Sequence, residues 1–535
     1  MASKSAEKSG HTNALQGSTV VVRENVSPLT SSSDDVTMDE ADRKLEAMGY
    51  TPVFKREFST WSSFSFAMSI SGVYGSLMST WIYGLQAGGA AAIMWSWVIG
   101  GAGAWALALS LAELSSAYPS SGAMYFTLKF LALEEQVPIL CWISGYINLV
   151  GTVTGSAATE YASSQMLLAA ASITSNFSYM PTNNHVVACM AILTVIHASI
   201  NTLPTLWLTR LTSGYVVFHI SVLVGACMCL LVQTKEKHSI AYAFTDFQPS
   251  SGWTPPGFAF LFGCLTPAWI MTSADSTARI AEEAKDPARI VPKAIANATT
   301  FTYIIGFLFN LVLVICMGDP LELVQSPSGQ PVAQLFFNAM GRTPAILFTL
   351  CGFAVMNLVA IPGIQAGSRT IFAFARDDLL PFSHHWRRVS KRSQTPIAAV
   401  WLYAALEIIV NLLGLMSDTA ISAVFNVCTV ALNISYLVPI VCKMLYGRFE
   451  KGPWNLGRWS FVMNAVAVGW NTLMAVIFFF PTRLPVAAEN MNYAIVVFVF
   501  VLMFSVGFWY THGRHFYTGP GTRRPLAATV VETLG

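Results

Sequence analysis

The chain is dominated by long apolar stretches. About 20 apolar residues in a helix cross the ~30 Å hydrocarbon core of a bilayer, and the sequence holds twelve stretches of roughly that length. Hydrophobic residues make up 54% of the chain and charged residues 11%, whereas about 25% of residues are charged in soluble domains. We therefore predict an all-α membrane protein with twelve transmembrane helices. The predicted spans are 59–84, 90–115, 138–172, 185–202, 206–233, 256–283, 293–317, 344–376, 396–414, 418–445, 459–481 and 491–511.

Polar segments flank these spans. Residues 1–57 are rich in Ser and Thr and contain no apolar stretch that could serve as a cleavable signal peptide. We predict a disordered cytoplasmic N-tail over 1–57, a twelve-helix domain over 58–512 and a cytoplasmic C-tail over 513–535. With the N-terminus inside, 25 of the 30 Lys and Arg residues fall on the inner side, which is the orientation that the positive-inside rule favours.

Two spans contain residues that interrupt a helix. Glycines at positions 72 and 75, flanked by serines, stand in the middle of the first span within Ile70–Ser76. A second interruption is predicted at Thr266–Trp269 in the sixth span, which contains a proline. Broken backbone at membrane depth must be buried in protein or line a cavity, and a pair of such breaks is typical of a transport site. The alternative for the small residues of the first span is a helix-packing face.

An even number of spans permits an inverted 5+5 repeat. Repeat one would cover about 58–233 and repeat two about 256–445, with helices 11 and 12 at about 459–511 outside the repeat. Spans 1 and 6 would then bring their breaks together near the midplane. Each break exposes N–H groups that attract an anion and C=O groups that attract a cation or ammonium. The predicted substrate contacts at the breaks are Ser71, Gly72, Gly75, Ser76 and Ser273.

Ionisable residues inside spans are costly and therefore need an explanation. Glu160 in span 3 is a candidate ligand for a substrate ammonium. His219 in span 5 and Asp275 in span 6 are candidates for carrying a coupling proton. The alternatives are a neutral core histidine for His219 and a structural pair with Arg279 for Asp275. Trp269 could stack on an ammonium group, although a packed core aromatic is the commoner role.

Other functional classes lack support in the sequence. The nine cysteines show no CxxC pair or metal-ligand spacing, so they are predicted to be small buried apolar residues. The HExxH, GxSxG and P-loop motifs are missing, which argues against an enzyme. Basic residues are scattered among loops, so no nucleic-acid partner is expected. We expect no cofactor, with a proton gradient as the driving force, and the lipid bilayer and a small molecule as partners.

Three motifs resemble those of the amino acid–polyamine–organocation superfamily. Residues 112–122 are similar to the end of its second span, 282–294 to its loop between spans 6 and 7, and 368–381 to the exit of its span 8. The resemblance covers about residues 50–520. Tyr83-Gly84-Leu85 with Gly88-Gly89, and Pro485-Val486 with Met491-Asn492-Tyr493, are similar to the fungal branch that holds GABA and choline permeases.

This resemblance implies a LeuT-like fold and proton-driven import. By position, it puts Ser71, Gly72, Gly75 and Ser76 at the substrate carboxylate, it implies a gating role for Trp269, and it matches Asp275 to a carboxylate found there in several members. Glu160 aligns with a substrate-site residue that is acidic in GABA-type relatives. His219 stands where proton-coupled relatives carry a lysine, and the first break reads Ser-Gly-Val-Tyr-Gly-Ser rather than the commoner Gly-Ser-Gly.

We therefore predict a multi-pass plasma-membrane permease with both termini cytoplasmic. It would import a small amino acid or amine, such as GABA or choline, with protons by alternating access. One alternative is a nutrient sensor that binds an amine with little transport. Another is an exporter or organellar transporter of a related amine.

Overall fold

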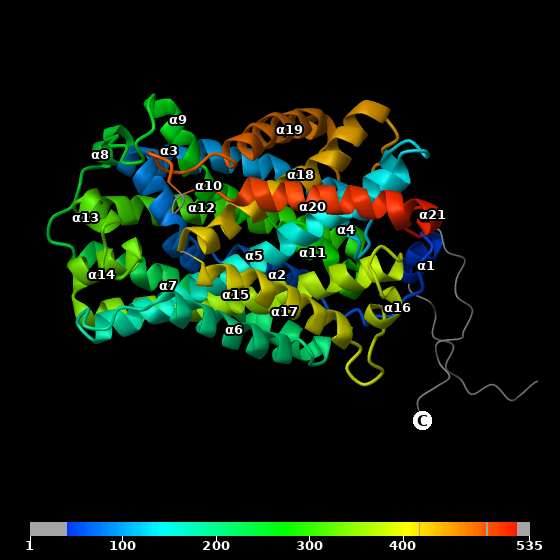
Figure 1. Cartoon of the computed structure of the whole chain (residues 1–535), viewed down its shortest axis with the longest axis horizontal. Coiled ribbons are helices and arrows are strands. Elements are labelled where there is room, and N and C mark those ends of the chain that lie inside the picture. Colours follow the sequence, from blue (N-terminus) through cyan, green and yellow to red (C-terminus); the bar gives the residue numbers. More distant parts are fainter. Residues whose placement is uncertain (1–39, 417, 488–490, 522–535) are drawn as a thin grey trace, which may run out of the picture. The chain divides into compact units, whose positions relative to one another are not determined.

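The chain is helical throughout its described part. The computed structural model describes residues 40–416, 418–487 and 491–521, and these residues contain helices and turns but no named strand. The long helices run side by side, with α8, α9, α13 and α14 at one end and α1, α16 and α21 at the other (Figure 1). The main helices of the bundle are α2 (Thr60–Ser71), α3 (Val73–Ala117), α5 (Val137–Thr174), α6 (Asn183–Ile200), α7 (Thr205–Gln233), α12 (Pro287–Cys316), α15 (Arg342–Arg376), α17 (Ile397–Asn411), α18 (Asp418–Tyr446), α19 (Ser460–Ile477) and α20 (Ala494–Phe508).

Shorter helices cap the long ones or continue them. They are α1 (Glu40–Ala47), α4 (Ala123–Leu131), α8 (Ile240–Thr245), α9 (Pro256–Gly263), α10 (Leu265–Met271), α11 (Ser276–Arg279), α13 (Pro320–Val324), α14 (Pro331–Met340), α16 (Ser383–Trp386) and α21 (Arg514–Phe516). Three 3₁₀ turns and one π turn complete the described helical elements: Ala281–Glu283, Leu412–Leu415, Gly457–Trp459 and Trp509–Gly513.

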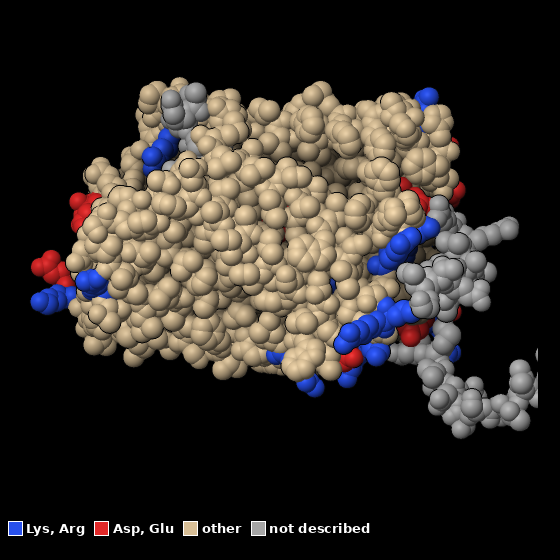
Figure 2. Space-filling view, turned by 60° about the horizontal axis from the view of Figure 1, so that its bottom comes forward, with Lys and Arg blue, Asp and Glu red and all other residues tan. Residues whose placement is uncertain are grey.

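Eleven helical segments in the described residues are long and apolar enough to cross a membrane. The first of them, Thr60–Ala117, has 58 residues and contains both the first and the second predicted span. Large apolar side chains face outward on several of these helices, among them Val217 on α7, Phe461 on α19 and Phe500 on α20, each more than 60% exposed. Figure 2 shows one face of the molecule, with charged side chains toward its two ends and an uncharged surface between them. The prediction of an all-helical membrane protein is thus confirmed.

The predicted break in the first span is present at Gly72. This glycine separates α2 from α3 and has φ 46° and ψ 42°, a left-handed conformation that other residues adopt at a cost. Ser59 begins α2 with a capping box that includes Ser62. Beyond the break, the Ser76 hydroxyl donates to the carbonyl oxygen of Ser71 at 2.9 Å, and this bond ties the two helix ends together.

The predicted position of the second break is wrong by about one turn. Thr266–Trp269 lies inside α10, which begins after Cys264. Pro267 is the third residue of α10, a first-turn position in which a proline is tolerated, and α9 ends at Gly263, four residues before it. The helix ends instead at Met271, and the unwound residues are 272–275, with Ser273 at φ 59°.

The helix α3 bends sharply at Gly88 and Gly89. Both residues have non-helical backbone angles, and Gly89 has φ 66°. A neighbouring loop satisfies part of the interrupted backbone, since Gln248 N–H donates to Gly88 O at 3.0 Å and Ala91 N–H donates to Asp246 O at 2.9 Å. The bend divides α3 into two helical lengths.

The structure differs from the predicted disordered tail over residues 40–57. This segment contains α1 and then runs against the bundle, where the Tyr50 hydroxyl donates to the Asp377 carboxylate at 2.9 Å. Asp377 also accepts from the Tyr125 hydroxyl at 2.6 Å and from the Gly521 N–H at 3.2 Å. The described ends of the chain therefore meet at one carboxylate. Residues 1–39 and 522–535 of the predicted tails lie outside the described residues.

Candidate functional site

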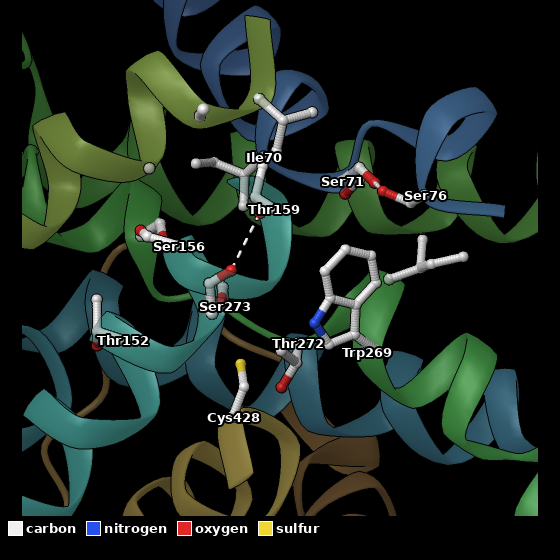
Figure 3. A pocket seen from close by; sticks show the side chains of 16 residues that line it. Ile70, Ser71, Ser76, Thr152, Ser156, Thr159, Trp269, Thr272, Ser273 and Cys428 are labelled. Carbon is white, nitrogen blue, oxygen red and sulfur yellow. Dashed lines mark hydrogen bonds between the residues drawn. The ribbon is translucent and has the colours of Figure 1, made fainter. Parts of the chain in front are cut away.

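A polar cavity lies between the two helix breaks (Figure 3). It leaves about 50 Å³ for the centres of water molecules, several times the ~10–15 Å³ that one ordered water needs. The lining comes from both breaks and from α5, α15 and α18. The lining residues are Ile70, Ser71, Ser76, Thr152, Gly155, Ser156, Thr159, Trp269, Ile270, Thr272, Ser273, Ser276, Val359, Ala360, Gly363 and Cys428.

Hydroxyl groups dominate the chemistry of this cavity. Eight of its sixteen lining residues are Ser or Thr, and none of the sixteen carries a charge. The Thr272 hydroxyl is buried and has no hydrogen-bond partner among the described residues. An unpartnered polar atom facing a small cavity indicates a polar occupant. The cavity suits a solute whose charges sum to zero, because it supplies dipoles and no counter-ion.

The break in the first span supplies oriented backbone dipoles. The first N–H groups of α3 have no helical acceptor, as at any helix start. The Tyr74 N–H donates to the His219 imidazole, with 3.0 Å between the backbone nitrogen and Nε2. His219 Nε2 therefore carries a lone pair, and its Nδ1 has no partner among the described residues. His219 caps α3 behind the break and is not among the residues that line the cavity.

The Cα hydrogens of Gly72 and Gly75 that a side chain would replace face α15 rather than the cavity. A Cβ atom on Gly72 would lie 2.3 Å from Cγ2 of Val359, and one on Gly75 would lie 2.7 Å from Met356. The two glycines thus let α15 pack closely against the break. Ser71 and Ser76, in contrast, line the cavity as the sequence predicts.

Trp269 and Ser273 also line the cavity. Trp269 is in the last turn of α10 and is 7% exposed. Its ring packs edge-on against Phe425 of α18, with 4.8 Å between centroids and an interplanar angle of 73°. The indole thus forms part of one wall of the cavity (Figure 3).

Asp275 belongs to a buried network beside the second break. Its Oδ2 is 2.8 Å from a guanidinium nitrogen of Arg279, and its Oδ1 accepts from the Tyr436 hydroxyl. Arg279 also donates to the hydroxyls of Thr152 and Thr370 at 2.7 and 2.9 Å. Asp275 and Arg279 thus form the structural pair that is the alternative to a proton-coupling role for Asp275. Thr152 connects the network to the cavity wall.

Glu160 faces away from the cavity. Its neighbour Thr159 lines the cavity, whereas the Glu160 carboxylate lies 2.6 Å from Nδ1 of His197 on α6. Glu160 is therefore not among the residues that line the cavity, and its contact with a substrate ammonium stays a prediction. A second carboxylate, Glu407 on α17, lies close enough for the Glu160 carboxylate to act on it electrostatically. The sequence carried no local signal for His197 or Glu407, because the helices that bring them together are distant in the chain.

A metal site is not evident in the described residues. They contain no group of three or more His, Cys, Asp or Glu side chains placed to hold an ion. All nine cysteines are free. The polar groups that line the cavity are hydroxyls, helix ends, one indole ring and the Cys428 thiol.

Comparisons with known proteins point to a single family. Residues 58–501 match the sequence model of a family described as Amino acid permease. Amino-acid permease 2 of Neurospora crassa is 77% identical over 501 residues, which cover 94% of this chain and 92% of the relative. An uncharacterised amino-acid permease of Schizosaccharomyces pombe is 47% identical, covering 92% of this chain and 91% of the relative. Amino-acid permease BAT1 of Arabidopsis thaliana is 28% identical, covering 90% of this chain and 96% of the relative.

Proposed function

The chain belongs to the amino acid permease family, and on this premise we propose that it imports a small zwitterionic amino acid with protons by alternating access. It is an amino acid transporter of the membrane and not an enzyme. The observation that carries the proposal is the uncharged, hydroxyl-lined cavity between two broken helices. Helix-end N–H groups suit the substrate carboxylate and helix-end carbonyls suit its ammonium.

The absence of charge from the cavity lining supports a zwitterion over a cation. A cationic substrate would need a counter-ion to offset its desolvation, and none of the sixteen lining residues supplies one. GABA and small α-amino acids meet this condition because each carries one positive and one negative group. Choline lacks a carboxylate for the N–H groups of the first break, so we expect it to be a poorer substrate than the zwitterions.

Twelve crossings and a LeuT-like repeat are part of the proposal. The segment Thr60–Ala117 would span on the order of 90 Å as one helix, about three times the ~30 Å hydrocarbon core. The bend at Gly88 and Gly89 supports a division into two crossings. The breaks would then lie in the first and sixth crossings, as a 5+5 inverted repeat requires. The excess of inner Lys and Arg supports cytoplasmic termini, and location in the plasma membrane is part of the proposal.

Uptake by the purified full chain in liposomes tests this function. With one proton per substrate, a gradient of one pH unit supports about tenfold accumulation, because a factor of ten corresponds to ~1.4 kcal/mol. We expect a radiolabelled small zwitterion to accumulate when the lumen is alkaline, and choline and lysine to compete weakly. Binding of the zwitterion without accumulation would instead identify a sensor. If preloaded substrate instead leaves the liposomes under the same pH gradient, the protein is an exporter.

Replacement of His219 tests whether it serves as a helix cap. His219→Gln keeps an acceptor within reach of the Tyr74 N–H, whereas His219→Ala leaves that buried donor unpaired at a cost of about 1–3 kcal/mol. We expect the Gln variant to retain pH-dependent uptake and the Ala variant to lose thermal stability. Thermal unfolding in detergent and uptake at two pH values are the measurements. A stable Gln variant whose uptake no longer depends on pH would assign the proton to His219.

A further inference from the structure

Three ionisable side chains meet inside the helix bundle, apart from the polar cavity. Glu160 of α5, His197 of α6 and Glu407 of α17 are each at most 2% exposed. The three helices pack against one another and against α15. We call these residues the Glu160 cluster. Burying ionisable side chains at membrane depth costs free energy, so their presence indicates a function.

The hydrogen bonds of Asn357 determine where one proton of His197 lies. The Asn357 amide nitrogen donates to the Ser163 hydroxyl at 3.0 Å and to the Phe353 carbonyl at 2.6 Å. Its oxygen must therefore be the atom that faces His197 Nε2 at 2.9 Å, and an oxygen only accepts. His197 Nε2 thus carries a hydrogen.

The contact between His197 and Glu160 holds a second proton. Nδ1 and Oε1 are 2.6 Å apart, and two lone pairs cannot approach that closely without a hydrogen between them. The proton belongs either to an imidazolium beside a carboxylate or to a carboxylic acid beside a neutral imidazole. In both cases the pair is neutral overall, so it offers Glu407 no net counter-charge.

Glu407 holds a third proton in this arrangement. Both of its carboxyl oxygens lack a hydrogen-bond partner among the described residues, and the side chain is fully buried. The nearby Thr194 hydroxyl donates to the Met190 carbonyl instead. An ionised carboxylate without hydrogen-bond donors or a net counter-charge in a buried interior is strongly unfavourable.

The Glu160 cluster is adjacent to the cavity on three helices. On α5, Thr159 lines the cavity and Glu160 enters the cluster. On α17, Tyr403 lies one turn before Glu407, and its hydroxyl is 2.7 Å from Ser156 of the cavity wall. On α15, Asn357 contacts the cluster and Val359 lines the cavity. Two other described ionisable groups lie within electrostatic reach of the cluster: Glu160 acts on the Cys189 thiol, and Glu407 acts on the Tyr403 phenol.

We propose that Glu407, together with the Glu160–His197 pair, is the binding site of the coupling proton. This inference rests on the proposed function and adds the site at which the proton is carried. A proton from the outer solution forms an O–H bond with the Glu407 carboxylate before the site closes. The same bond breaks toward inner water when α5, α15 and α17 rearrange around the departing substrate. One proton enters and one leaves in each cycle, and no other bond changes.

Substitution of Glu407 in the full chain tests this site in liposomes. Glu407→Gln keeps the shape of the side chain but cannot titrate. We expect the ratio of uptake driven by a one-unit pH gradient to substrate counterflow at equal pH to fall by up to about tenfold, because the gradient no longer contributes its ~1.4 kcal/mol. Glu322→Gln removes an exposed carboxylate on α13 by the same change and should leave the ratio unaltered. Glu407→Gln with an unaltered ratio would overturn the proposal.

A second variant distinguishes proton binding from packing. Glu407→Asp keeps a titratable group but removes a methylene and leaves a small void. Proton binding predicts that Asp retains more pH-driven uptake than Gln, with a displaced pH profile, whereas packing predicts the reverse order. If Gln exceeds Asp while the wild-type chain accumulates substrate, the proton site is wrong and the proposed function stands. If the wild-type chain accumulates no substrate, both are wrong.

Discussion

Gly72→Ala is expected to abolish amino acid uptake. The left-handed backbone at this position costs an alanine about 1–2 kcal/mol. Its Cβ would also lie 2.3 Å from Cγ2 of Val359, and relief of that overlap costs about 1–3 kcal/mol more. Val359 lines the cavity, so its displacement changes the substrate site directly. Initial rates of zwitterion uptake and thermal unfolding of the purified variant are the measurements.

Two further variants isolate the cause of this loss. Gly214→Ala on α7 introduces a Cβ with nothing within 4 Å, and in a helix this change is stabilising by about 0.5–1 kcal/mol. Gly214→Ala should therefore transport normally. Val359→Ala in the Gly72→Ala background removes the overlap but leaves the backbone strain, so we expect partial recovery of stability. Normal uptake by Gly72→Ala alone would show that the break does not control the site.

Asp275→Ala is expected to prevent the protein from folding stably. Arg279 is 1% exposed, and removal of Asp275 leaves its guanidinium buried without a counter-ion. Breaking a buried ion pair in this way costs about 3–5 kcal/mol, a large share of the ~5–15 kcal/mol that stabilises a typical protein. We expect loss of the monodisperse species in size-exclusion chromatography and a much lower unfolding temperature.

A surface ion pair provides the matched control. Arg289 and Asp286 are 3.2 Å apart, with side chains 64% and 46% exposed, and such pairs contribute only about 0–1 kcal/mol. Asp286→Ala should therefore leave chromatography and unfolding unchanged. If Asp275→Ala folds normally and its uptake has lost pH dependence, Asp275 carries a proton and the structural role assigned here is wrong.

Hydropathy and glycine chemistry made much of the fold predictable. A stretch of about 20 apolar residues has few alternatives to a membrane helix, so the positions of the long helices follow from composition. Gly72 could be located because only glycine adopts a left-handed backbone readily. The second break was misplaced because Pro267 was taken as its cause. A proline in the first turn of a helix does not end that helix, and the unwound residues 272–275 contain none that forces a break.

The sequence by itself determined that this chain spans a membrane through helices, that one of them breaks at Gly72, and that its motifs belong to permeases. These properties depend on residues close together along the chain. Only the tertiary structure decided which polar groups face the cavity and which face each other. His197 and Glu160 are 37 positions apart, and His197 and Asn357 are 160 apart. A difference of about 100° between neighbouring residues on a helix separates Thr159 in the cavity from Glu160 in the cluster. Contacts of this kind follow from how helices pack, and no local pattern encodes them.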